Sequence, residues 1–160
     1  MADTPKKTNP TCDKQVTAAR AAADREVAPL KAVMAGMNEE SGPTKESLKA
    51  ARVIVERYIK TNDEFNDKHA AERLKALGGA PDEAKKSGAD RIEVVRQKGH
   101  AEIDPMRNLS EALRLANAKN DVEVLKPHLV QLEVLANVTA DERVQRAEYA
   151  CNKPKSKGKG

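Results

Sequence analysis

Apolar residues recur at steps of three and four along four long segments of this 160-residue chain. That spacing places the apolar side chains on one face of an α-helix. The segments are residues 11–38, 44–77, 81–118 and 122–151. The sequence as a whole shows neither strand-like alternation nor an internal repeat. The pattern therefore predicts an all-α protein.

Residues that end helices and begin new ones separate the four segments. These breaks are Gly42-Pro43, Gly78-Gly79 and Asn120-Asp121. Glycine and proline stop a helix, and Thr44 and Pro81 suit the start of the next one. Because short connections make neighbouring helices antiparallel, the sequence predicts an elongated up-down-up-down four-helix bundle with a coiled-coil-like seam. At 1.5 Å per residue such helices are about 45–50 Å long.

Two positions make the predicted helices less regular. Asp104-Pro105 interrupts the third helix, because Asp104 suits a helix cap and Pro105 a first turn. The third helix is therefore predicted to be either broken or kinked there. Thr139 and Glu142 have the spacing of a capping box, so the fourth helix is expected to run unbroken or to restart near residue 139.

The net charge of +4 belongs to the ends of the chain. Residues 153–160 hold four lysines and no acids, residues 1–14 carry +1, and the body between them carries −1. We expect residues 1–10 and 153–160 to be disordered around a helical domain of residues 11–152. A nearly neutral body argues against a nucleic-acid-binding face, whereas the lysine tail suits an anionic membrane surface.

The two cysteines, Cys12 and Cys151, lie at the two edges of the predicted helical domain. An even number of antiparallel helices returns the chain to its starting end, which would bring the two thiols together. We therefore predict a Cys12–Cys151 disulfide, worth up to about 5 kcal/mol on the loop-entropy model. It would indicate a periplasmic or secreted protein, since disulfides persist in oxidising compartments. The alternative is a pair of unrelated thiols in the cytoplasm.

Motifs for catalysis or metal binding are not found in the sequence. None of His69, His100 and His128 belongs to a Glu-x-x-His or His-x-x-x-His motif, and the chain has no Cys-x-x-Cys. His100 and Asp104 have the spacing of a local i,i+4 hydrogen bond. No Gly-x-Ser-x-Gly or phosphate-binding loop occurs either. We therefore expect no metal, no cofactor and no enzymatic activity.

One group of residues is a candidate ligand pocket. In the simplest bundle, Met34, Met37, Met106 and His128 share a layer about 35–40 Å from the end that holds both termini. Methionine commonly fills gaps where helices pack irregularly, so core packing is one interpretation. The others are a pocket for an apolar ligand, and thioether and imidazole ligation of a soft metal or haem iron.

Two classes of function remain open. The first is a non-enzymatic extracytoplasmic binding protein that recognises another protein or a small apolar ligand. The second is an intracellular structural or adaptor bundle whose basic tail contacts nucleic acid or an anionic membrane surface. The state of the two cysteines discriminates between them, because a disulfide favours the first class.

Overall fold

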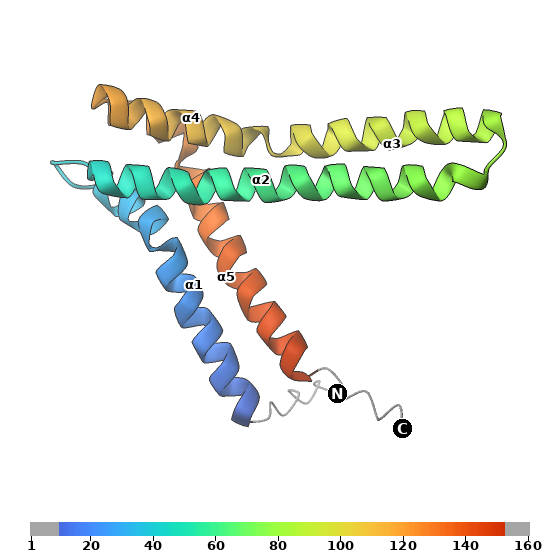
Figure 1. The fold of residues 1–160 in the computed structure, drawn as a ribbon. Helices are drawn as coiled ribbons and strands as arrows, with labels where there is room; N and C mark the ends of the chain where they lie inside the picture. The colour runs from blue at the N-terminus through green and yellow to red at the C-terminus, as the bar shows by residue number, and fades with distance from the viewer. Residues whose placement is uncertain (1–9, 153–160) are drawn as a thin grey trace, which may run out of the picture.

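The computed structural model of this chain describes residues 10–152, which form helices joined by short turns (Figure 1). In chain order these are α1 (Pro10–Gly36), α2 (Lys45–Ala76), the 3-10 helix η1 (Leu77–Gly79), α3 (Asp82–Glu102), α4 (Asp104–Lys119), the 3-10 helix η2 (Val122–His128) and α5 (Leu129–Asn152). Within this range no residue is in a strand. The disorder expected for the ends of the chain concerns residues outside the described part, except Pro10, which is helical.

The predicted all-α four-helix bundle is confirmed, with α3 and α4 as the two halves of its third helix. The break falls at Ile103, directly before the expected Asp104-Pro105 pair, and Pro105 occupies the first turn of α4. The restart expected as an alternative near Thr139 does not occur, since α5 continues through that residue. The fourth helix instead begins with η2, which contains Pro127.

The four helices form two antiparallel pairs that diverge from a shared junction (Figure 1). We call both pairs hairpins, although α1 and α5 are not consecutive in the chain. One hairpin pairs α1 with α5, and the other pairs α2 with α3 and α4. We call the free parts the α1–α5 arm (residues 10–25 and 140–152) and the α2–α3 arm (residues 62–102). In a simple stack of helices the turn at η1 would lie beside the termini. In the observed fold these two ends are at different tips of a V (Figure 1).

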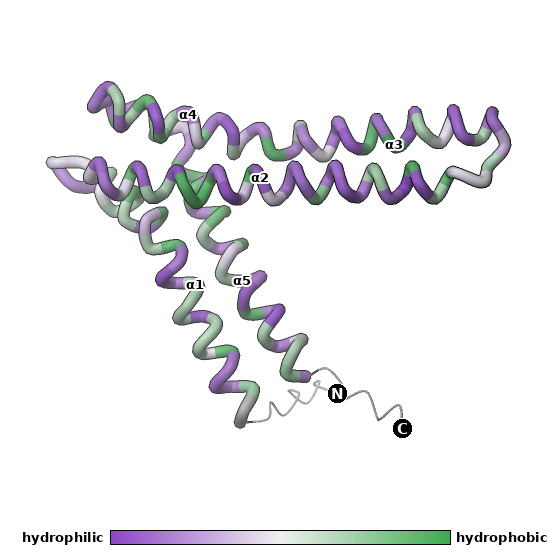
Figure 2. The backbone as a smooth tube through the Cα atoms, in the orientation of Figure 1, coloured by the Kyte–Doolittle hydropathy of each residue, from purple (hydrophilic) through white to green (hydrophobic). Residues whose placement is uncertain are grey.

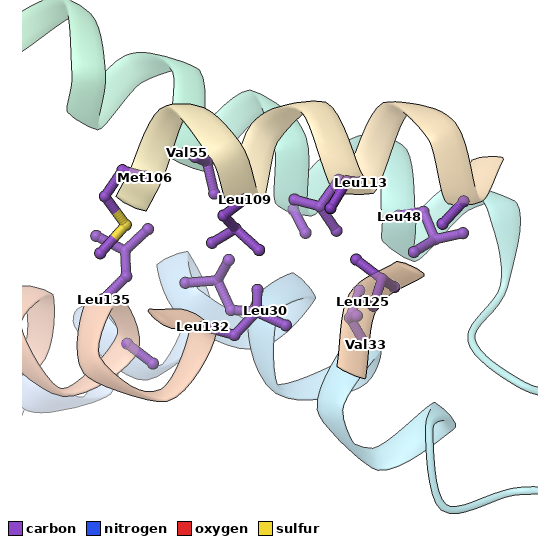
Figure 3. Close-up of a cluster of buried hydrophobic side chains, with 14 of the residues drawn as sticks. Leu30, Val33, Leu48, Val55, Met106, Leu109, Leu113, Leu125, Leu132 and Leu135 are labelled. Carbon is purple, nitrogen blue, oxygen red and sulfur yellow. The ribbon is translucent and has the colours of Figure 1, made fainter. Parts of the chain in front are cut away.

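The hydrophobic core lies where the hairpins meet (Figure 3). Its largest side chains come from the second half of α1, the first half of α2, α4, η2 and the first half of α5. Each is at most 2% exposed: Leu30, Val33, Leu48, Val55, Leu109, Leu113, Leu125, Leu132 and Leu135. Fully burying one such side chain stabilises the fold by about 1.5–3 kcal/mol. The junction is therefore the main source of stability.

The two arms contain few buried side chains, and hydrophilic residues dominate much of the α2–α3 arm (Figure 2). α3 contributes no buried residue. Inside the α1–α5 arm the small side chains of Ala23 and Val144 are buried. At its tip Cys12 and Cys151 form a disulfide with their Cα atoms 5.6 Å apart, which confirms the predicted pairing.

The turns use the residues that the sequence suggested. The Thr44 hydroxyl accepts a hydrogen bond from the Ser47 N–H at 3.1 Å and caps α2. Gly42 has a φ of 72°, in the left-handed region that suits glycine. Asn120 has a φ of 53° at the end of α4, where asparagine tolerates the same conformation.

None of the described helices is long and apolar enough to cross a lipid bilayer.

Candidate functional site

Three residues of the predicted layer of Met34, Met37, Met106 and His128 lie in the core or against it, namely Met34, Met37 and Met106. Met106 lies beside Val55 and Leu135 at one end of the core (Figure 3). Val33, the sequence neighbour of Met34, lies at the other end with Leu48 and Leu125 (Figure 3). From Leu48 to Val55 the rise along α2 is about 10 Å.

Val33 and Met106 therefore lie against different turns of α2 (Figure 3). Met34 and Met37 are half-buried against the core, Met106 is buried in it, and His128 is half-buried at the end of η2. These residues do not line the cavities described below. Ligand binding by any of them stays a prediction.

A polar cluster joins α2 to the broken third helix. The His100 ring lies between two carboxylates of α2, with Nδ1 2.6 Å from Asp63 Oδ1 and Nε2 2.8 Å from Asp67 Oδ1. One residue on each side of the break thus contacts the same face of α2, because Arg107 of α4 also donates to both Asp63 oxygens, at 2.6 and 2.9 Å. Sequence spacing suggested Asp104 as the partner of His100. That prediction was wrong, since Asp104 instead pairs with Arg107 at 3.3 Å.

The cluster shifts the pKa of its members. Hydrogen bonds to Asp67 and Asp63 raise the pKa of His100 above its usual 6.5. The Arg107 guanidinium lowers the pKa of Asp63, and His100 lowers the pKa of Asp67. Next to the cluster, Arg96 lowers the pKa of Glu93 to about 2. Both ring nitrogens of His100 face carboxylates, so the ring acts as a charged donor. The contacts of His100 and Arg107 hold α3 and α4 against α2, and we call them the joint.

Metal binding finds no support in this part of the molecule. Within residues 10–152, no three or more side chains of His, Cys, Asp or Glu are placed to hold a metal ion. His69 lies apart from the cluster and stacks on Phe65, with ring centroids 5.9 Å apart.

A cleft lies between α2 and α5. These two helices border the inner angle of the V (Figure 1). The volume of the cleft is about 180 Å³. Ile54, Arg57, Tyr58 and Thr61 line it from α2, Glu26 from α1, and Leu135, Thr139, Glu142, Arg143 and Arg146 from α5. We call it the inner cleft.

The floor of the inner cleft is apolar and its rim is charged. Leu135 is buried, Ile54 and Tyr58 are half-buried, and the arginines are exposed. Arg143 forms an ion pair with Glu26 that bridges α5 to α1. Among the described residues, neither Arg57 nor Arg146 has a carboxylate within ion-pair distance. The cleft thus presents two guanidinium groups above an apolar surface.

A second open cavity continues the inner cleft along α5. It shares Glu142 and Arg146 with the cleft and adds Gln145 and Tyr149. The chain has two tyrosines, so both lie at this surface. Tyr149 is 72% exposed, although its ring is among the few aromatic groups of the protein.

Sequence reasoning missed the inner cleft. Arg57 and Arg146 lie on polar helix faces, which in a parallel stack are simply solvated. They face a cleft only because α2 and α5 separate at an angle (Figure 1). The rarity of aromatic residues was the one usable signal, because it makes the positions of Tyr58 and Tyr149 notable.

Comparison of the chain with models of protein families, with curated proteins and with solved structures finds no match.

Proposed function

We propose that this protein is a non-enzymatic binding protein of an oxidising, extracytoplasmic compartment that recognises another protein through its inner cleft. The observation that carries the proposal is the composition of the cleft, with Arg57, Tyr58 and Arg146 around the buried Leu135. Arginine and tyrosine are enriched among the residues that dominate the energy of protein–protein interfaces.

The shape of the cleft favours a protein partner over a small apolar ligand. Pockets for small ligands are usually enclosed, mostly apolar and about 300–1,000 Å³ in volume. The inner cleft is smaller, at about 180 Å³, and half of its lining residues are charged. Its continuation along α5 to Tyr149 gives an extended surface, which suits a polypeptide segment.

The disulfide supports the proposal that the protein is located in an oxidising, extracytoplasmic compartment. Cys12 and Cys151 are paired, and no free cysteine occurs among the described residues. Stable structural disulfides are rare in the cytosol and common in secreted and periplasmic proteins. A mass spectrum of unreduced protein from its native source should therefore show the two terminal peptides linked. Free thiols in that preparation would count against the proposed extracytoplasmic location.

Site-specific photo-crosslinking tests the recognition of a protein. A benzoylphenylalanine probe replaces Thr61, which lines the cleft, and a matched probe replaces Lys68, two turns further along α2 and outside it. The Thr61 probe should capture a defined protein in the native compartment, and the Lys68 probe should not. The purified partner should then bind in calorimetry, and Tyr58→Ala should weaken that binding. Equal capture by both probes, or none, would reject the cleft as the binding face.

The alternative is an intracellular adaptor that contacts an anionic surface through the lysines of residues 153–160. The concentration of charge in that tail favours it, because polybasic segments bind anionic lipids and nucleic acid electrostatically. Binding to phosphatidylserine vesicles or to a DNA duplex should then disappear on deletion of residues 153–160 and weaken with salt. Binding that survives the deletion would show that the lysine tail is not the contact.

A further inference from the structure

We infer that the inner cleft binds an acidic polypeptide segment, whose carboxylates pair with Arg57 and Arg146 while an adjacent apolar side chain rests on Ile54 and Tyr58. This inference rests on the proposed function and names the chemistry of the partner. Guanidinium groups match carboxylates in charge and shape, and they can bind them through two parallel hydrogen bonds.

The pairing pattern around the cleft leaves two positive charges available. Arg143 already forms an ion pair with Glu26 across the α1–α5 hairpin, and the glutamate side chain is 25% exposed. Arg52 likewise forms an ion pair, at 3.6 Å, with Glu56 one turn further along α2. Arg57 and Arg146 have no such partner among the described residues, although they line the cleft from α2 and α5. Carboxylates of a ligand that lies between the two helices would supply a partner to each arginine.

The Arg143–Glu26 pair also keeps the cleft in shape. It ties the wall formed by α5 to α1, and the disulfide ties the same two helices at their ends. On the other side, Arg52 and Glu56 both hydrogen-bond to the buried Ser110 of α4, which fixes the face of α2 next to Arg57. Both arginines are thus presented from helices that are held in place without the ligand, so binding orders their side chains but not the backbone.

The remaining lining residues favour a peptide over a polyanion. Glu26 is paired with Arg143, and Glu142 offsets part of the remaining positive charge, so the cleft suits a few separate carboxylates better than a continuous phosphate backbone. The half-buried Ile54 and Tyr58 offer apolar contact that a sugar–phosphate chain does not use. A segment with alternating acidic and aliphatic residues uses both features.

Fluorescence anisotropy with labelled peptides of equal length tests the inference. The probes are a peptide of alternating glutamate and leucine, the same peptide with glutamine or with lysine for glutamate, and a single-stranded oligonucleotide. The glutamate peptide should bind most tightly, and its affinity should fall with salt. Arg57→Glu and Arg146→Glu should each weaken it at least tenfold, which equals about 1.4 kcal/mol. The control Arg91→Glu, on α3 and outside the cleft, should leave the affinity unchanged.

The outcomes separate the inference from the proposed function. Circular dichroism confirms that each variant is folded, and Arg57→Gln replaces Arg57→Glu if the latter is not. If the glutamine or lysine peptide binds the cleft better than the glutamate peptide, and Tyr58→Ala abolishes that binding, the acidic partner is rejected and protein recognition stands. Tighter binding of the oligonucleotide than of the glutamate peptide also rejects the acidic polypeptide as the partner. If no probe binds and the Thr61 crosslinker captures nothing, both proposals fail.

Discussion

Gly36 shows how a single residue fixes the turn between α1 and α2. A Cβ atom added at this position would lie 2.5 Å from Pro43 Cα and 2.8 Å from Pro43 N. Both are backbone atoms of a rigid residue, so the neighbour cannot move aside cheaply. Only glycine permits this close approach of the two chain segments.

Gly36→Ala should therefore lower the free energy of unfolding by about 1–3 kcal/mol, the usual cost of overpacking. Urea denaturation followed by circular dichroism measures the change. Gly78→Ala is the matched control, because a Cβ there meets nothing within 4 Å, and stability should stay the same or rise slightly. Equal behaviour of the two variants would contradict the close packing of Gly36 on Pro43.

Leu132 tests the assignment of the core at the same scale. It is fully buried, whereas Val130, two residues earlier on α5, is 63% exposed. Leu132→Ala should cost about 2–5 kcal/mol, as expected for truncation of a buried leucine. Val130→Ala should change stability by less than about 0.5 kcal/mol. A small loss at Leu132, measured by urea denaturation, would remove it from the core.

At the scale of helices, the His100 cluster compensates for the lack of a core in the α2–α3 arm. Glycine at position 99 allows the approach, because an added Cβ would lie 2.7 Å from the Asn66 side chain of α2. The cluster then holds α2 to α3 through His100 and to α4 through Arg107. The arm is therefore joined mainly by polar contacts, which depend on pH and salt.

The pH dependence of this joint has a definite sign. The folded pKa of His100 is raised, so its contribution is complete below about pH 6.5 and is lost as pH rises through the folded value. The folded pKa values of Asp63 and Asp67 are lowered from 3.8. Their contribution is present above about pH 4 and is lost as pH falls through the folded values. The joint is tightest between these limits.

Two measurements check the joint. The stability difference between the wild type and His100→Gln, from urea denaturation, should shrink as pH rises through the folded pKa of His100. In an NMR titration that pKa should fall when Asp63→Asn removes one carboxylate partner. Arg96, Arg107, Glu93 and Asp104 remain around the ring in both proteins. A His100 pKa that does not change in Asp63→Asn would contradict the observed contact.

At the scale of the whole molecule, stability is distributed unevenly. The junction holds the large buried side chains, and each arm depends on a few specific contacts. For the α1–α5 arm those are Ala23, Val144 and the Cys12–Cys151 disulfide. Such regions open more easily than a core, because little apolar surface is lost on opening.

Replacing both cysteines by serine should therefore lower the melting temperature, with a loss of stability of up to about 5 kcal/mol on the loop-entropy model. Hydrogen exchange should show the loss of protection in residues 10–25 and 140–152 first, while α4 stays protected. Uniform loss of protection throughout the protein would mean that the disulfide supports the junction as well. The Arg143–Glu26 pair then becomes the next contact to test.

The sequence by itself determined which parts of the chain are helical, where they stop, and that the ends meet. Those properties depend on local signals, namely the three- and four-residue apolar spacing, the Gly78-Gly79 break and the Asp104-Pro105 pair. The Cys12–Cys151 pairing followed from the even number of helices.

Only the tertiary structure decided the angle between the hairpins. Helix crossing depends on how the side chains of Leu30, Leu109 and Leu132 interdigitate at the junction, and this packing is not encoded in the spacing of any one helix (Figure 3). The angle opened the inner cleft between Arg57 and Arg146. The pairing of α2 with α3 inside one hairpin placed His100 between two carboxylates more than 30 residues away in sequence.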